Sequence, residues 1–159
     1  MKPSDASPHL DLGHLALFTG QRINQLVREE LARLGHADAR DTHGFVFQHL
    51  IDGSRSISSL AERMGISQQA ASKRVAEMVE MDYVEIDPAS RGRTRLVAIA
   101  PRGWEVIQQA RAIRAKLHAE LHTRLGPQDV ALASSILRNA LDSLGGLEPV
   151  LQRRAREPD

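Results

Sequence analysis

The 159-residue sequence contains no cysteine. This absence excludes a disulfide framework, thiolate zinc ligands and a thiol-based redox switch. Aromatic residues make up only 3% of the chain, so the core must consist mainly of Leu, Ile, Val and Ala side chains. Because Ala and Leu are strong helix formers, this composition favours a helical protein.

Neither sign of charge predominates, since the formal net charge is +1. A nucleic-acid partner would therefore need a local basic patch. No apolar run is long enough to span a bilayer, and the first residues, MKPSDASPHLDLG, lack the apolar segment of a signal peptide. We expect a cytoplasmic protein with no membrane partner.

Motifs of common enzyme classes are also missing. The sequence has no GxSxG, no Walker loop and no metal-hydrolase helix, and its scattered Ser, His and Asp residues form no triad pattern. We expect neither an enzymatic activity nor a cofactor.

Apolar spacing and helix-breaking residues predict several helices. A first helix can begin near Ser7 and Pro8, because proline is tolerated at the first helical position. A second follows Asp41 and ends at Gly53. A long helix can run from Pro101 to about residue 125, with an apolar stripe of Trp104, Ile107, Ala110, Leu117, Leu121 and Leu125. One more helix follows, and the polar tail could form a short helix after Pro149.

The segment from residue 56 to residue 80 has the clearest local signals. Ser56 can cap a short helix, ISSLAERM, that Gly65 ends, and Ser67 can cap the next helix. Two helices joined by a tight turn that contains glycine make a helix-turn-helix. The second helix begins with SQQAASKRV, whose polar residues lie on its first two turns.

In a helix-turn-helix, the start of the second helix enters the major groove of DNA. Glutamine amides can pair with adenine, Lys73 can donate to guanine or phosphate, and serine hydroxyls suit phosphates or bases. The short side chains of Ala70 and Ala71 would permit a close approach. The alternative interpretation is a polar helix face that meets only water.

A basic β-hairpin is predicted directly after these helices. YVEID alternates like a strand, PASRG is prone to turn, and RTRLVAIA is rich in β-branched residues. Arg91, Arg93 and Arg95 lie at its tip and second strand, from which guanidinium groups could enter a minor groove. Each arginine alone could belong to a solvated turn, but a helix-turn-helix followed by a basic hairpin is typical of a winged helix.

The run LAERMGISQQAASKRVAEMVEMDYVEIDPASRGRTRLVAIAPRG resembles the winged-helix core of the MarR family of bacterial transcription regulators, with a motif match over residues 42–103. The resemblance implies a mainly α fold with a small β-hairpin wing. A winged helix-turn-helix domain at 41–100 would be flanked by a helical dimerisation domain built from 8–40 and 101–145, with a polar tail at 146–159. It also implies a homodimer that binds a palindrome in double-stranded DNA, most simply a repressor released by a small ligand.

The resemblance also implies site residues. The family's contacts from the recognition helix fall on Ser67, Gln68, Gln69, Ser72 and Lys73, and its wing arginine falls on Arg93. Arg74 stands where the family usually has a smaller or apolar residue, so we expect it to reach a phosphate. Family wings commonly carry aspartate two residues before the wing arginine, but Arg91 stands there, and extra phosphate affinity would replace the usual bracing.

The last two helices carry wider apolar stripes than one buried face requires. Such stripes bury either a thick monomer core or a second subunit, and we favour the homodimer. A two-fold dimer would place its recognition helices about 34 Å apart, one turn of DNA. The stripes consist of Val106, Ile107, Ile113 and Leu117 in one helix and Leu132, Ile136, Leu137, Ala140 and Leu141 in the other.

A small organic effector is the further partner that the resemblance implies. Its pocket would lie between the domains, bordered by helices that carry Phe18, Phe45, Phe47 and Trp104, although each of these residues could equally belong to an ordinary core.

Two alternative functions stay open. In a winged-helix module that binds protein, the polar face of 68–73 would be apolar or acidic. In a metal-responsive regulator, His118 and His122 could share a metal with His14, His43 or His49. The ligand positions of zinc-sensing relatives match Gly44 and Phe45, which cannot ligate through their side chains, so we expect no metal.

Overall fold

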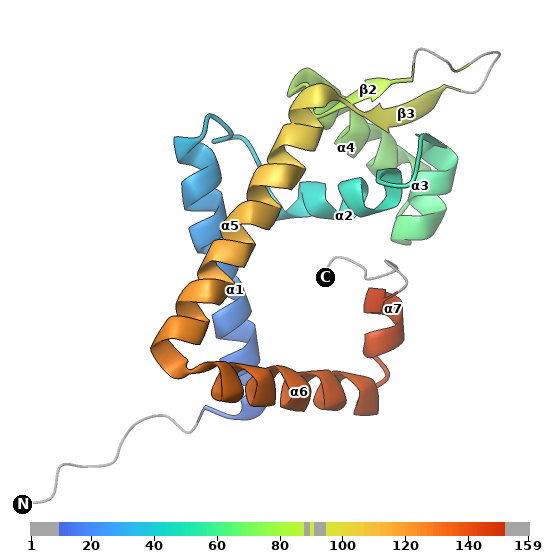
Figure 1. The fold of residues 1–159 in the computed structure, drawn as a ribbon. Coiled ribbons are helices and arrows are strands. Elements are labelled where there is room, and N and C mark those ends of the chain that lie inside the picture. Colours follow the sequence, from blue (N-terminus) through green and yellow to red (C-terminus); the bar gives the residue numbers. More distant parts are fainter. Residues whose placement is uncertain (1–9, 88–89, 91–94, 152–159) are drawn as a thin grey trace, which may run out of the picture.

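The computed structural model describes residues 10–87, 90 and 95–151. These residues form seven helices and three short strands. The strands and α2 to α4 lie together in the upper part of the view, and α6 and α7 lie apart from them at the lower end (Figure 1). In chain order the elements are α1 (Leu12–Arg33), α2 (Asp41–Leu50), β1 (Arg55–Ser56), α3 (Ile57–Met64), α4 (Gln68–Glu80), β2 (Val84–Ile86), β3 (Leu96–Ile99), α5 (Pro101–Leu125), α6 (Pro127–Ser143) and α7 (Leu147–Leu151).

The helix-turn-helix consists of α3 and α4, as predicted. The Ser56 hydroxyl accepts a hydrogen bond from the Ser59 N–H at 3.2 Å, which caps α3. Gly65 ends this helix in the left-handed conformation, with φ of 67°, where a side chain would be strained. The Ser67 hydroxyl then caps α4 by accepting from the Ala70 N–H at 3.1 Å. These caps reproduce the expected bounds of both helices.

The predicted hairpin forms the larger part of a three-stranded antiparallel sheet with the order β1-β3-β2. Val84 of β2 pairs with Ile99 of β3, and Arg55 of β1 pairs with Val97 on the other side of β3. Sequence analysis did not predict β1. A strand of two polar residues has no detectable alternation, and it exists because β3 supplies its hydrogen-bonding partners.

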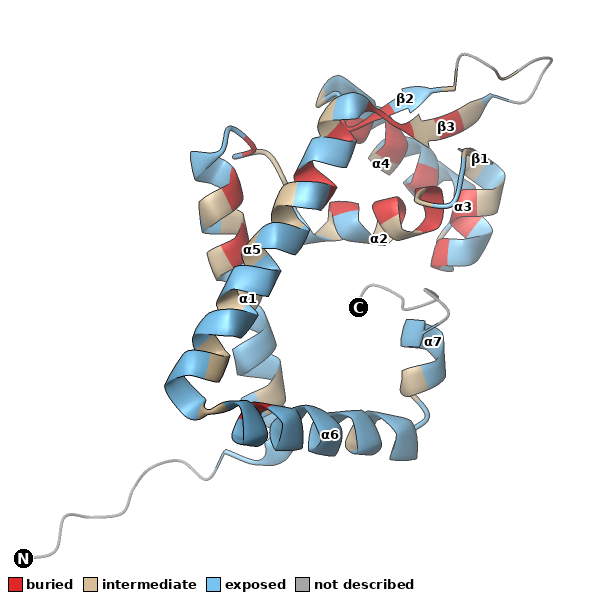
Figure 2. Ribbon diagram, in the orientation of Figure 1, coloured by how far each residue is buried: buried red, intermediate tan, exposed pale blue. Residues whose placement is uncertain are grey.

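The core joins the helix-turn-helix, the sheet and the upper parts of α1 and α5 (Figure 2). Tyr83, just before β2, is fully buried at its centre, where its ring lies 6.2 Å from that of Phe47. The rest of the core is mainly aliphatic, as the low aromatic content predicts. The most deeply buried of them are Val46, Leu60, Met78, Val84 and Val97.

The ends of the chain differ from expectation. Helix α1 begins at Leu12, because the Asp11 carboxylate accepts a hydrogen bond from the His14 N–H at 2.9 Å and caps the helix there. Ser7 and Pro8 lie outside the described residues. Helix α7 contains Pro149 instead of following it, which the missing proline N–H permits in a first turn.

Helices α5 and α6 lead away from the core. Helix α5 runs beside α1 toward the lower end of the molecule, where α6 crosses below and carries α7 (Figure 1). The buried stripe of α5 includes Gly103, Val106 and Ile107, whereas Trp104, predicted to lie in it, is 36% exposed. Within the part of the chain that the structure describes, no helix has the length and apolarity needed to cross a membrane.

Candidate nucleic-acid interface

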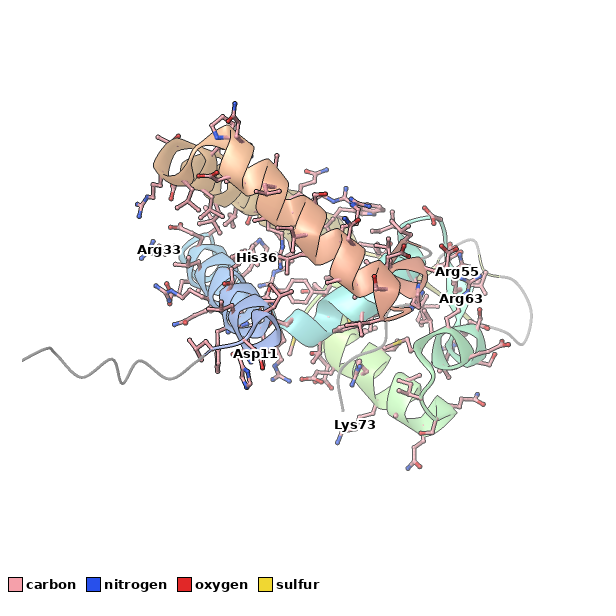
Figure 3. All side chains as sticks on the ribbon, turned by 90° about the horizontal axis from the view of Figure 1, so that it is seen from below. Asp11, Arg33, His36, Arg55, Arg63 and Lys73 are labelled. Carbon is pink, nitrogen blue, oxygen red and sulfur yellow. The ribbon has the colours of Figure 1, made fainter. Side chains whose placement is uncertain are left out.

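Helix α4 has one buried and one exposed edge. Ala71, Val75 and Met78 are buried and hold the helix on the core. The opposite side of its first two turns points outward, because a helix turns once in 3.6 residues. Gln68, Gln69, Ser72 and Lys73 are all exposed, and Lys73 extends away from the body of the protein (Figure 3). The first two turns of α4 therefore present amide, hydroxyl and ammonium groups to solvent.

Ser67 and Arg74 border this edge and differ from the other residues. The Ser67 oxygen already accepts a hydrogen bond as the cap of α4, so its hydroxyl proton is the group it can offer to a phosphate. Arg74 is half-buried, and its charge helps to lower the pKa of His43 of α2, although burial is the largest cause of that lowering. The expectation that Arg74 reaches a phosphate remains a prediction.

The hairpin carries the second group of predicted contacts. At the end of β2 and β3 nearest the tip, the Asp87 N–H donates to the Leu96 carbonyl at 2.8 Å. Arg95 is exposed immediately before β3. Arg91 and Arg93 lie outside the described residues.

Two arginines, one in β1 and one in α3, were missed by sequence analysis. Arg55 donates through Nε to the His49 carbonyl at 2.6 Å. Arg63 of α3 is exposed and labelled close to Arg55 in Figure 3, and both lower the pKa of buried His49, after burial itself. Their spacing of eight residues gave no signal, because β1, from which Arg55 comes, was not predicted.

Arg102, at the start of α5, connects the segment between α1 and α2 to the C-terminal end of α4. Its guanidinium donates to both carboxylate oxygens of Asp38, at 3.0 and 3.1 Å. It also donates to the carbonyls of Met81 and Gly35. The guanidinium carbon lies 4.6 Å from the centroid of the Tyr83 ring. The Tyr83 hydroxyl also donates to Asp38. These bonds, mainly that from Arg102, lower the pKa of Asp38 to about 2, whereas burial and the Asp38 charge raise that of Tyr83.

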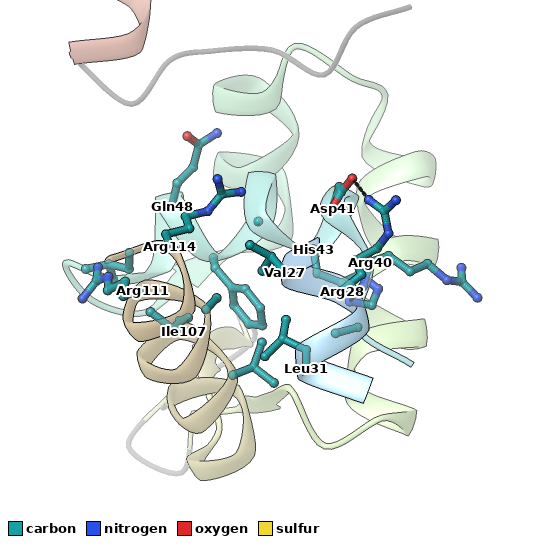
Figure 4. A pocket seen from close by; sticks show the side chains of 16 residues that line it. Val27, Arg28, Leu31, Arg40, Asp41, His43, Gln48, Ile107, Arg111 and Arg114 are labelled. Carbon is teal, nitrogen blue, oxygen red and sulfur yellow. Dashed lines mark hydrogen bonds and ion pairs between the residues drawn. The ribbon is translucent and has the colours of Figure 1, made fainter. Parts of the chain in front are cut away.

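A cavity of about 250 Å³ lies between α1, α2 and α5 (Figure 4). Its floor is apolar, and four arginines reach its rim. Arg28 forms an ion pair with Asp41, and Arg114 donates to the Asn24 amide oxygen at 2.6 Å. The floor is made of Val27, Leu31, Phe47, Ile51, Val106, Ile107 and Ala110, and the rim arginines are Arg28, Arg40, Arg111 and Arg114.

The four aromatic residues predicted to border a ligand pocket do not come together. Phe47 lines the cavity, whereas Phe45 is half-buried against the core. Phe18 is 53% exposed beside the groove between α1 and α5, and Trp104 is exposed near the start of α5. Only Phe47 of these four lines the cavity between α1, α2 and α5.

The histidines considered as metal ligands are also dispersed. The Nε2 atoms of His118 and His122 lie 3.0 Å apart on α5, but His43 and His49 are buried in α2 and His14 contacts Asp11. Among the described residues, no three His, Cys, Asp or Glu side chains gather closely enough to hold a metal ion.

Comparison with known proteins identifies this architecture. Residues 41–93 match the sequence profile of the MarR family. RV1404 from Mycobacterium tuberculosis is 21% identical, with a TM-score of 0.65 over 91% of this chain and 99% of that chain. The reduced form of MarR from E. coli is 23% identical, with a TM-score of 0.63 over 82% and 96%.

A mutant of MepR from S. aureus, solved bound to an oligodeoxyribonucleotide, is 16% identical, with a TM-score of 0.57 over 84% of this chain and 98% of that chain. At these identities the solved structures show a shared fold alone. No curated protein sequence matches significantly. The family profile covers the helix-turn-helix and the start of the hairpin, and the shared fold extends through the flanking helices; residues 41–93 therefore match the MarR family, and the chain has the winged-helix fold of these solved structures.

Proposed function

We propose that the protein is a homodimeric, sequence-specific DNA-binding transcription regulator, most simply a repressor that occupies a promoter. The observation that carries this proposal is the exposed edge of α4, where Gln68, Gln69, Ser72 and Lys73 face solvent on a helix anchored by its opposite side. Glutamine and lysine at these positions suit base edges and phosphates in a major groove. The DNA-bound MepR mutant supports the use of this fold on DNA.

The alternative functions have less support. A module that binds protein through this face would need apolar or acidic residues, yet residues 68–73 carry a lysine, two glutamines and no acidic side chain. A metal-responsive regulator would need more ligands than the pair His118 and His122, the two histidines that the described structure brings together.

A homodimer is favoured by the apolar surface of α6. Only Val130 of this helix is buried in the protomer, and Leu132 is 60% and Ile136 46% exposed. Exposed apolar surface of this extent, continued by Leu137, Leu141 and Leu144, is typical of an interface. The groove between α1 and α5 offers further surface for a second copy, because it combines charged residues with the apolar side chains of Ile23, Leu26, Ile113, Leu117 and Leu121.

Selection of bound fragments from random DNA tests this proposal. We expect a palindromic consensus, because a two-fold dimer presents two identical α4 helices. A duplex with one half-site should bind about 100-fold more weakly than the palindrome, since the second contact is then lost. Recovery of no consensus, or equal affinity for one and two half-sites, would contradict it.

Two substitutions separate base recognition from phosphate contact. Gln69→Ala is expected to change the preferred bases at one position of each half-site, by about 1–3 kcal/mol of discrimination. Arg95→Ala should weaken binding to all sequences and reduce the slope of log K against log salt by about one. Fluorescence anisotropy with selected and mutated duplexes measures both effects. Gln108→Ala is the control, because Gln108 is exposed on α5. If Gln69→Ala and Arg95→Ala both bound DNA as this control does, the interface would lie elsewhere.

The cavity supports a small organic effector of defined chemistry. Its apolar floor suits an aromatic or aliphatic body, and its rim arginines suit a carboxylate. Benzoate at ten times its dissociation constant should stabilise the protein by about 1.4 kcal/mol and weaken DNA binding. Benzyl alcohol, which is neutral, and the Arg111→Gln variant with benzoate should show a smaller rise in Tm. Equal effects of the acid and the alcohol would exclude the arginine contact.

A further inference from the structure

Two ion pairs lie in series between α1 and the recognition helix. Arg28 of α1 pairs with Asp41, the first residue of α2, and Arg40, the preceding residue, pairs with Glu77 of α4. Because residues 40 and 41 are adjacent, the two pairs connect α1, the start of α2 and α4. Neither pair follows from local sequence, since their members are 13 and 37 residues apart.

The backbone of Arg40 is held firmly on the core. Its N–H donates to Nδ1 of His43 at 3.3 Å, and His43 is only 2% exposed, with its ring 5.6 Å from that of Tyr83. The Glu77 side chain extends from the turn of α4 that contains fully buried Met78. The Arg40 side chain therefore bridges two anchored backbones.

A second arginine contacts the same end of α4. Arg102 of α5 donates to the carbonyl of Met81, the C-terminal cap of α4, while it binds Asp38. The segment that precedes α2 thus reaches α4 twice, through Arg40 at Glu77 and through Asp38 and Arg102 at Met81. Both contacts lie at the C-terminal end of α4, whereas the exposed polar edge lies at its N-terminal end.

We propose that Arg40 and Glu77, supported by Arg28 and Asp41, position the recognition helix relative to the dimerisation helices. This inference rests on the proposed dimeric DNA-binding function. From Glu77 to Gln68 the helix spans about 14 Å, so a tilt of about 5° at Glu77 moves the polar edge by about 1 Å. The tilt would change the separation of the two recognition helices in a dimer, and hence the preferred spacing of half-sites.

The position of these residues also connects the recognition helix to the cavity. Arg28, Arg40 and Asp41 all line it (Figure 4). An anion bound there would compete with Asp41 for Arg28 and with Glu77 for Arg40. Release of the recognition helix from either contact would give an effector a direct route to DNA affinity.

The test measures the affinity of the protein for a series of duplexes that differ only in the distance between the two selected half-sites. The half-sites lie at the selected distance, one base pair closer, or one or two base pairs further apart. Glu77→Gln is expected to bind the best duplex about 5-fold more weakly and to lose most of its discrimination among spacings. Its Tm should change little, because an exposed ion pair contributes little stability. The exchanged pair, Arg40→Glu with Glu77→Arg, should restore affinity and spacing preference.

Glu80→Gln is the matched control, because it removes an exposed carboxylate from the same helix. Wild-type affinity and spacing preference in Glu77→Gln would overturn the proposal, as would failure of the exchanged pair to restore them. A fall in Tm of Glu77→Gln by more than about 5 °C would indicate a structural role instead and would also overturn it. If the wild-type protein bound none of the duplexes, the DNA-binding function itself would be wrong.

Discussion

Gly103→Ala is expected to destabilise the protein by about 2–4 kcal/mol. A Cβ atom at this position would lie 2.0 Å from the Tyr83 carbonyl oxygen and 2.9 Å from Cγ2 of Ile99. The closer contact is backbone, so α5 would have to move away from the segment before β2. Overpacking of a buried site usually costs about 1–3 kcal/mol, and more where the neighbour is backbone that cannot turn aside, as here. We therefore expect a cost above this range, which outweighs the gain of about 1 kcal/mol from alanine in a helix.

The displacement would also affect contacts at both sides of Gly103. The Ala100 N–H donates to the same Tyr83 carbonyl at 3.1 Å, and Arg102 must remain beside Asp38. Urea unfolding followed by circular dichroism measures the loss. The matched control is Gly44→Ala in α2, where an added Cβ meets nothing within 4 Å, and it should be neutral or stabilising by up to about 1 kcal/mol. Equal stability of Gly103→Ala and wild type would mean that α5 and Tyr83 do not approach this closely.

Arg102→Leu is expected to cost about 2–3 kcal/mol at neutral pH. The substitution keeps an apolar stem but removes the donor of the Met81 carbonyl and the two Arg102 bonds to the Asp38 carboxylate, which then keeps the Tyr83 hydroxyl. Loss of such bonds accounts for the larger effects of single substitutions. The Asp38 side chain is 37% exposed, so solvent screens part of its pairing and the ion pair alone contributes only about 1 kcal/mol. Arg33→Leu, which removes an exposed pair with Glu30, is the control.

The pH dependence of this variant has a defined sign. Arg102 lowers the pKa of Asp38 from 3.8 to about 2, so the pairing stabilises the folded state fully above pH 3.8. This stabilisation is lost as the pH falls through about 2. In Arg102→Leu the pKa of Asp38, followed by NMR, should rise toward 3.8, and the difference in stability from wild type should shrink between pH 5 and pH 2. A constant difference across this range would exclude the Asp38 pairing as its source.

Much of the fold depends on short-range chemistry that the sequence displays. Ser56, Gly65 and Ser67 set the bounds of α3 and α4 because caps and left-handed turns involve residues within one helical turn. The exposed polar edge of α4 follows equally from helical periodicity, given Ala71 and Val75 on the buried side. The predictions that failed concern features that depend on contacts between distant residues. Strand β1 exists only because β3 lies beside it, and Trp104 is exposed because Gly103, its neighbour, forms the close contact.

The sequence alone predicted the mainly helical winged helix-turn-helix, the basic hairpin after it, and the residues of α4 that face solvent. Tertiary structure alone decided which distant side chains meet. Arg102 reaches Asp38 across 64 residues and Arg40 reaches Glu77 across 37, and the cavity forms where α1, α2 and α5 converge. The physical reason is range: caps and periodicity act within a few residues, whereas ion pairs and cavities depend on how whole helices pack.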